Sequence, residues 1–300
     1  MMDVYHEGEL YVQKRTGEGK IADQNAKMIS NQFSNGIIQF LKSQQFAVLS
    51  SADRKGNVWV TFLTGEAGFA EVMDEHTMVI HDEIIIVDDP FGSMWLNQEQ
   101  IGMLIIDTKR RIRLRINGTA HVEQGKLKVT AHQVYGNCPK YIQKRSLRAD
   151  SDAHRQLKSM HRSSELSQQQ REWIAQSDTF YIGSVSESGE MDASHRGGNP
   201  GFLQVIDAKT IRFPDYYGNS MYNTLGNIYS NPASGLLFID YEHGHSLHLT
   251  GKAEIIWDEE ESAQFRGAER LVQFVAEEVV QLNNAAEMHW EDTELSPYNP

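Results

Sequence analysis

The chain has 300 residues, of which 40% are hydrophobic and 23% charged, a globular composition with enough residues for one large or two ordinary domains. Its formal net charge of −13 argues against non-specific nucleic-acid binding, and no apolar run is long enough to span a bilayer. The N-terminal stretch has no apolar segment of the kind that a secretory signal requires. Because the single cysteine, Cys138, cannot form an internal disulfide, we expect a cytoplasmic protein.

The predicted elements begin after residue 25, because the residues before it are polar and weakly patterned. From Ala26 to Leu41, apolar residues at spacings of one, three and four predict an amphipathic helix. Short apolar segments bounded by turn residues then predict a series of strands. These strands are Phe46–Ser51, Val58–Leu63, Thr77–His81, Glu83–Val87, Leu104–Asp107 and Ile112–Val122.

The second half of the chain repeats the first. Gly56 aligns with Gly189 at an offset of 133 (189 − 56), and turn glycines and strand apolar residues then stay in phase. A period this long indicates a tandem duplication of one β-rich unit and not a solenoid. Short strands with few helices favour a mainly β fold, and two barrels that share a face would cover their edge strands.

The segment between the two units is polar and has two stretches compatible with helix, Leu157–Arg162 and Ser167–Ala175. After the second unit, apolar residues on one face predict a helix over Glu259–Asn283, and the last ten residues are expected to be loose. The predicted organisation is an N-terminal unit over 1–131, a helical linker over 132–176, and a C-terminal unit over 177–300 that carries the site and the C-terminal helix.

Residues 192–228 have the composition of a binding site. A planar guanidinium holds a phosphate bidentately, adjacent glycines let backbone amides approach the same anion, and a helix start leaves free N–H groups for it. The candidate residues for binding the phosphate of a cofactor are Ser194, His195, Arg196, Gly197, Asn219, Tyr222, Thr224 and Asn227.

Each candidate has a plain structural alternative. Arg196 could pair with an acidic neighbour on the surface, and His195 could be a packed histidine, since it should point to the opposite face of the strand. Asn219 or Ser220 could be an ordinary helix N-cap. No convincing acid–base pair stands out, so no catalytic residue is assigned.

The first unit has Thr61-Phe62-Leu63-Thr64 where the second has Ser194 to Gly197, so it is expected to have lost the site. It instead has Arg111, Arg113 and Arg115 on one face of a strand. Arg113 and Arg115 could reach a ligand at the seam between two barrels, or the strand could simply be charged and solvated.

Two other groups favour a plain interpretation. Cys138 lies beside Lys140, which could lower a thiol pKa, but no partner base is evident. His243, His245 and His248 do not have the spacing of a known zinc site, so no metal is expected.

The order S-H-R-G-G, F-P-D-Y-x-G-N, L-G-N and N-P, followed by a strand with G-x-A, resembles the pyridoxamine 5′-phosphate oxidase-like FMN-binding split barrels, in particular their two-domain branch. The segments HEGELYVQKR and YGNCPKYIQKR also look like that branch, so the resemblance covers nearly the whole chain.

The resemblance implies tandem FMN-binding split barrels with FMN as cofactor, and an FMN-dependent oxidoreductase that forms a homodimer. A small-molecule substrate or reductant such as NAD(P)H is implied, without nucleic-acid or membrane partners. The chain ends in SPYNP and not in an arginine-rich stretch, which argues against the vitamin B6 reaction itself. The alternatives are a non-catalytic flavin-binding or redox-sensing protein, the same fold with haem or a deazaflavin, and a domain pair that binds nothing.

Overall fold

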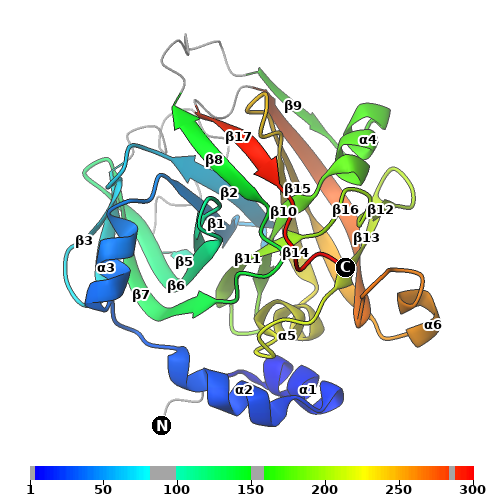
Figure 1. The fold of residues 1–300 in the computed structure, drawn as a ribbon, viewed down its shortest axis with the longest axis horizontal. Helices are drawn as coiled ribbons and strands as arrows, with labels where there is room; N and C mark the ends of the chain where they lie inside the picture. Colours follow the sequence, from blue (N-terminus) through cyan, green and yellow to red (C-terminus); the bar gives the residue numbers. More distant parts are fainter. Residues whose placement is uncertain (1–3, 82–98, 150–158, 284–287) are drawn as a thin grey trace.

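Two large antiparallel sheets lie side by side in the computed structural model, which describes residues 4–81, 99–149, 159–283 and 288–300 (Figure 1). The first sheet contains β1 (Phe46–Ala52), β2 (Val58–Thr64), β3 (Ala70–Val72), β4 (Thr77–Ile80), β5 (Glu99–Asp107), β6 (Ile112–Glu123) and β7 (Lys126–Asn137). The second contains β10 (Thr179–Val185), β11 (Met191–Gly197), β12 (Gln204–Val205), β13 (Thr210–Asp215), β14 (Ala233–Ile239), β15 (Ser246–Ile256) and β16 (Arg270–Asn283), with β9 (Ser159–Ser163) paired to β16. The fold is mainly β, a pair of split barrels, as the sequence predicts.

The two sheets have the same strand order. The first runs β2-β1-β5-β6-β7-β4-β3 and the second runs β11-β10-β14-β15-β16-β13-β12. Each sheet also has a bulge at the equivalent place, at Gly118 in β6 and at Gly251 in β15. A Cβ at either glycine would lie 2.0 Å from a carbonyl oxygen of the neighbouring strand, so both bulges require glycine. An internal duplication predicts this correspondence.

The barrels meet through a shared apolar seam. Phe46, Val60 and Leu104 of the first barrel pack with Tyr181 and Leu237 of the second in one buried cluster. The backbones themselves come into contact, because a Cβ at Gly102 of β5 would lie 2.4 Å from the carbonyl carbon of Asp192 in β11. A pocket at this seam therefore has walls from both barrels.

Helices cover the ends of the barrels. They are α1 (Glu7–Thr16), α2 (Gly19–Asn25), the 3₁₀ turn η1 (Ala26–Met28), α3 (Asn35–Leu41), α4 (Gln168–Gln176), α5 (Asn223–Ser230) and α6 (Glu259–Ser262). A separate two-stranded sheet joins β8 (Lys144–Ala149) to β17 (Met288–Glu294). Helix α1 packs against α5 at the lower edge of Figure 1. No helix in the described parts of the chain has the length and apolarity needed to cross a membrane.

The predicted helix over Glu259–Asn283 is wrong. Only Glu259–Ser262 is helical, and Arg270–Asn283 forms β16, the longest strand of the second barrel. This strand pairs with β15 along one edge and with β13 and β9 along the other, and buried residues occur on both of its faces. Apolar residues on both faces of a strand can mimic helical spacing, while its valines favour the extended backbone.

The predicted helix from Ala26 to Leu41 is interrupted, because Ser30 forms a β-bridge with Val134 between η1 and α3. In the predicted linker, Ser167–Ala175 is confirmed as a helix by α4, which begins with a capping box at Ser167. The described part of the linker is otherwise not helical: it contains the end of β7, then β8 and β9, and β9 includes the described part of the predicted helix Leu157–Arg162.

Both ends of the chain are more ordered than expected. Residues 4–25, expected to be weakly patterned, contain α1 and α2. The last ten residues are not loose, because β17 extends to Glu294 and the backbone N–H of Ser296 donates to Gln143. The predicted strand Glu83–Val87 lies outside the described residues.

Candidate functional site

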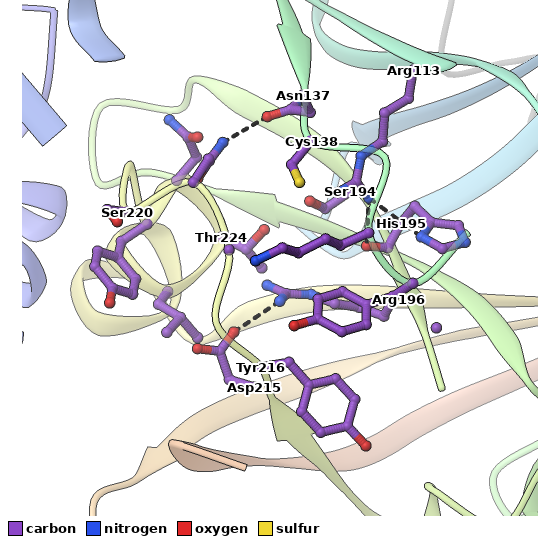
Figure 2. A pocket seen from close by; sticks show the side chains of 18 of the residues that line it. Arg113, Asn137, Cys138, Ser194, His195, Arg196, Asp215, Tyr216, Ser220 and Thr224 are labelled. Atoms are coloured by element: carbon purple, nitrogen blue, oxygen red, sulfur yellow. Dashed lines mark hydrogen bonds and ion pairs between the residues drawn. The ribbon is translucent and has the colours of Figure 1, made fainter. Parts of the chain in front are cut away.

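A pocket opens at the seam, and nine of the ten predicted cofactor-binding residues line it (Figure 2). These are Arg113, Arg115, Ser194, His195, Arg196, Gly197, Asn219, Tyr222 and Thr224. The arginines at 113 and 115 come from β6 of the first barrel, and the others come from β11 and the start of α5 in the second. We call this the seam pocket.

Asn227 does not line the seam pocket. Its Nδ2 donates to Ser184 Oγ at 3.0 Å, and its Oδ1 lies 2.8 Å from Nε2 of His6. The side chain is therefore used to hold α5 against β10 and the start of α1. Asn227 lies one turn beyond Asn223 on α5, too far along the helix to reach the pocket.

Arg196 is paired with an acidic neighbour, the alternative considered from the sequence. Its Nη1 donates to Asp215 Oδ1 at 2.8 Å, and the other oxygen of Asp215 accepts from Arg270 at 2.7 Å. Asp215 is buried and shared between two guanidinium groups, so the trio keeps a net positive charge. The Nε of Arg196 is buried and has no hydrogen-bond partner among the described residues.

Arg113 is the least compensated cation in the seam pocket. Its Nη1 lies 3.3 Å from Nδ1 of His195, and no carboxylate in the described part of the chain forms an ion pair with it. Burial, followed by the positive charge of Arg115, lowers the pKa of Arg113 to about 10. The group is still a cation at neutral pH, and its buried Nε lacks a partner among the described residues.

Arg115, by contrast, is neutralised by a carboxylate, although its buried Nε has no partner among the described residues. It forms a 3.0 Å ion pair with Asp192 and donates to Tyr135, Asn223 and Ser194. This buried network ties β6 of the first barrel to β11 and α5 of the second. Arg115 therefore has a structural role in the wall of the pocket. Arg113 instead places a positive charge in the pocket that no carboxylate among the described residues neutralises.

His195 lines the pocket as a neutral group. Its ring packs edge-on against Tyr181, with ring centroids 5.7 Å apart. Burial and the nearby charge of Arg113 lower the pKa of His195 well below its ordinary value. A neutral imidazole accepts a hydrogen bond from Arg113 without competing for an anion.

The start of α5 supplies unpaired donors. Tyr222, the N-cap residue, has a left-handed backbone (φ 60°), and no side chain caps the helix. Asn219 and Ser220 therefore do not act as the N-cap of α5. Asn219 instead binds Asn137 of the first barrel at 2.6 Å, while the buried hydroxyl of Ser220 has no partner among the described residues.

A segment that the sequence did not assign to the site forms part of its wall. Asn137, Cys138, Lys140 and Tyr141 follow β7 and cross from the first barrel to the second. The Tyr141 hydroxyl donates to the Tyr217 carbonyl at 2.9 Å, and the Lys140 ammonium lies 4.6 Å from the centre of the Tyr217 ring. The motif YGNCPKYIQKR is part of the family resemblance in the sequence, but only the fold places Lys140 in the same pocket as Arg113 and Arg196.

At the equivalent position in the other half of the seam, the described residues that replace the pocket residues are buried. Phe62 stands in place of His195, and Ser246 and His248 stand in place of Arg113 and Arg115. His248 is fully buried, bonded at 2.7 Å to the Val60 carbonyl and at 2.8 Å to Ser246 Oγ. Among the described residues the two halves of the seam therefore differ, with Arg113 and Arg115 in a pocket on one side and buried Ser246 and His248 at the matching positions on the other.

The residues present fit the phosphate end of a ligand. Arg113, Lys140 and Arg196 face the single carboxylate of Asp215, and orphaned donors remain on Arg113 and Arg196. The enclosed space is about 90 Å³, small beside the hundreds of Å³ typical of a whole-ligand pocket. This enclosed space suits a phosphate group. A flavin ring is larger than this space and would extend beyond it.

Comparison with known proteins identifies the second barrel. Residues 166–292 match the family model described as pyridoxamine 5′-phosphate oxidase. The match confirms the resemblance for the part of the chain that carries Arg196 and α5. No curated protein is significantly similar to the chain.

Solved structures share segments of the fold at low identity. HupZ from Group A Streptococcus is 17% identical, over 38% of this chain and 92% of that chain, with a TM-score of 0.32. A pyridoxinephosphate oxidase family protein from Clostridium acetobutylicum is 15% identical, over 40% and 89%, with a TM-score of 0.30. An FMN-binding protein from Syntrophomonas wolfei is 13% identical, over 37% and 82%, with a TM-score of 0.28. Likeness at this level does not carry function from one protein to another.

Proposed function

We propose that the chain is an FMN-binding flavoprotein whose flavin phosphate is held in the seam pocket. The observation that carries the proposal is Arg113, a buried guanidinium that no carboxylate neutralises within the described residues. A buried charge without a counter-charge is costly, and a phosphate would supply the counter-charge and accept the orphaned N–H groups. The family match of the second barrel agrees with this ligand.

Each part of the pocket would have a distinct task. Arg113, Lys140 and Arg196 would bind the phosphate oxygens, and the uncapped first turn of α5 would add backbone N–H groups. Neutral His195 would hold the guanidinium of Arg113 in place. Bound FMN would supply hydride or electron transfer, and the chain would contribute anchoring and the electrostatic field around it.

We further propose that the protein is an FMN-dependent oxidoreductase that acts on a small molecule, with NAD(P)H as a possible reductant. The proposal rests on the family of the second barrel, since no acid–base pair in the pocket points to one substrate. A homodimer and a reducing cytoplasmic environment belong to the same proposal. The free thiol of Cys138 agrees with that environment.

An absorption spectrum of the purified protein tests the cofactor. We expect flavin bands, with FMN in the supernatant after heat release. A Soret band would instead identify haem, and a colourless protein that takes up no added FMN would refute the proposal.

Turnover of the bound flavin by NAD(P)H tests the oxidoreductase. Reduction of the bound flavin by NAD(P)H would favour an oxidoreductase, whereas a flavin that no reductant reaches would favour a binding or sensing protein.

A further inference from the structure

A second cavity, of about 470 Å³, lies under the start of α1 and is within the usual size range of ligand sites. Its walls come from residues 4–10, from β5, β6 and β7 of the first barrel, and from β11 and α5 of the second. Asn223 is the one residue that lines both this cavity and the seam pocket. We call it the α1 cavity.

Two buried carboxylates face the α1 cavity with one cation between them. Glu9 is 4% exposed and Asp192 is 2% exposed. Asp192 is paired with Arg115 at 3.0 Å. Glu9 accepts hydrogen bonds only from uncharged donors, the side chain of Asn223 and the backbone N–H of His6. The two buried carboxylates therefore have one cation, Arg115, near them, and the exposed Glu7 and Glu190 add further negative groups to the same wall.

In the empty cavity, a proton on Glu9 takes the place of the missing positive charge. Burial raises the pKa of Glu9 to about 8, and the charge of Asp192 adds to this effect. At neutral pH the carboxyl is therefore mostly protonated. The charged or titratable groups that act on it from its own and neighbouring elements are Tyr5, His6, Arg115, Tyr135 and Asp192.

The cavity also offers an acceptor without a donor. Asn117 lies at the bulge of β6, where its Nδ2 donates to Gln133 at 3.2 Å. Its Oδ1 is buried and has no hydrogen-bond partner among the described residues. A buried acceptor in this state needs a donor from water or from a ligand.

We propose that the α1 cavity is a binding site for a small aliphatic amine or diamine. An ammonium group carries one positive charge and three donors but no acceptor, so it matches Glu9, Asp192 and the free oxygen of Asn117. The apolar stem would lie against Tyr5, Leu10 and Met191 in the same wall. The site is separate from the proposed flavin site, and the inference does not depend on the flavin.

Charge balance sets the pH dependence of binding. An ammonium favours the ionised form of Glu9, so binding below about pH 8 expels the proton that the carboxyl holds in the empty cavity. The affinity should therefore rise as the pH is raised from 7 toward 9, as long as the amine itself stays protonated. A ligand that merely filled space would show no such dependence.

Isothermal titration of the full chain with putrescine, and with 1,4-butanediol as the uncharged match, tests the site. We expect one putrescine per chain, with the diol bound at least about tenfold more weakly, a difference of about 1.4 kcal/mol. Titration in buffers of different ionisation enthalpy should show proton release at pH 7. Equal binding of diamine and diol, or no binding of putrescine, would overturn the inference.

Variants locate the site. Glu9→Gln should weaken putrescine binding about tenfold and abolish proton release, while Glu187→Gln, on an exposed turn, should change neither. If Glu9→Gln does not fold by circular dichroism, Asn117→Ala serves instead and should also weaken binding. Unchanged affinity in a folded Glu9 or Asn117 variant would contradict the placement. Putrescine binding to flavin-free protein, repeated after FMN addition, separates this result from the fate of the flavin proposal.

Discussion

Arg113 and Arg196 show how one residue type has different roles at two places in the same pocket. The sequence favours Arg196, because it stands in a glycine-rich motif. In the fold, Arg196 already shares the carboxylate of Asp215, while Arg113 faces the pocket without an acidic partner among the described residues. Pairing across a seam depends on which strands meet, and a single sequence does not contain that information.

The first prediction follows from this difference. Arg113→Ala should weaken FMN binding at least about tenfold, because a charge-assisted contact with the phosphate is lost. Arg196→Ala should have a smaller effect, because its charge is partly used by Asp215. Quenching of flavin fluorescence measures both affinities. Arg162→Ala, which removes a surface ion pair with Glu278, is the matched control and should leave the affinity unchanged.

The second prediction concerns Asp215, which we expect to be a structural residue. Asp215→Ala leaves two guanidinium groups, Arg196 and Arg270, without their shared partner in a mostly buried setting. Breaking a buried pair from one side typically costs about 3–5 kcal/mol of unfolding free energy. Urea denaturation measures the loss. Glu278→Ala, at a largely exposed pair, should cost less than about 1 kcal/mol, and an equal loss in both variants would contradict the assignment.

At the scale of elements, the strands with clear alternation and glycine turns were predicted well. The errors lie where tertiary pairing decides the structure, as in β16, which has apolar residues on both faces. Helix α1 was missed because its apolar face is short and because its capping box has His6 at the N-cap, where the sequence signature has Ser or Thr. The crossing segment after β7 was recognised as a motif, but its place in the pocket depends on the packing of the two barrels.

The bulge glycines give the third prediction. In Gly251→Ala the new Cβ would lie 2.0 Å from the Val275 carbonyl oxygen, so β15 and β16 would have to separate locally. We expect a loss of about 1–3 kcal/mol in unfolding free energy, as for other overpacked sites. Gly19→Ala, in α2 with open space around the Cβ position, should be neutral or slightly stabilising. Comparable melting temperatures for the two variants would show that the bulge tolerates a side chain.

At the scale of the whole molecule, the internal repeat predicted two equivalent barrels, and their strand orders agree. It also suggested that the first unit lacks the site, since Phe62 and Leu63 replace the polar residues. The sequence could not show that His248 is buried at the seam, or that the N-terminal helix α1 packs against α5. These features arise from contacts between residues far apart in the chain.

The fourth prediction concerns acid stability. Burial lowers the pKa of His248 to about 4, whereas the unfolded chain has the ordinary value of about 6.5. Between these pH values the unfolded state binds a proton that the folded state does not bind, so stability should fall as the pH falls through this window. The slope of unfolding free energy against pH should be shallower for His248→Gln by up to one proton. An unchanged slope in His248→Gln would refute the role of His248.

The difference between the two halves of the seam has a consequence for how such a protein can change. In a pair of identical subunits, a substitution that fills one site fills its symmetry mate as well, so neither can be given up alone. Here the barrels are covalently joined and independently encoded. His248 can be a buried packing residue in one half while Arg113 lines a pocket in the other, and each half is free to acquire mutations that the other would not tolerate.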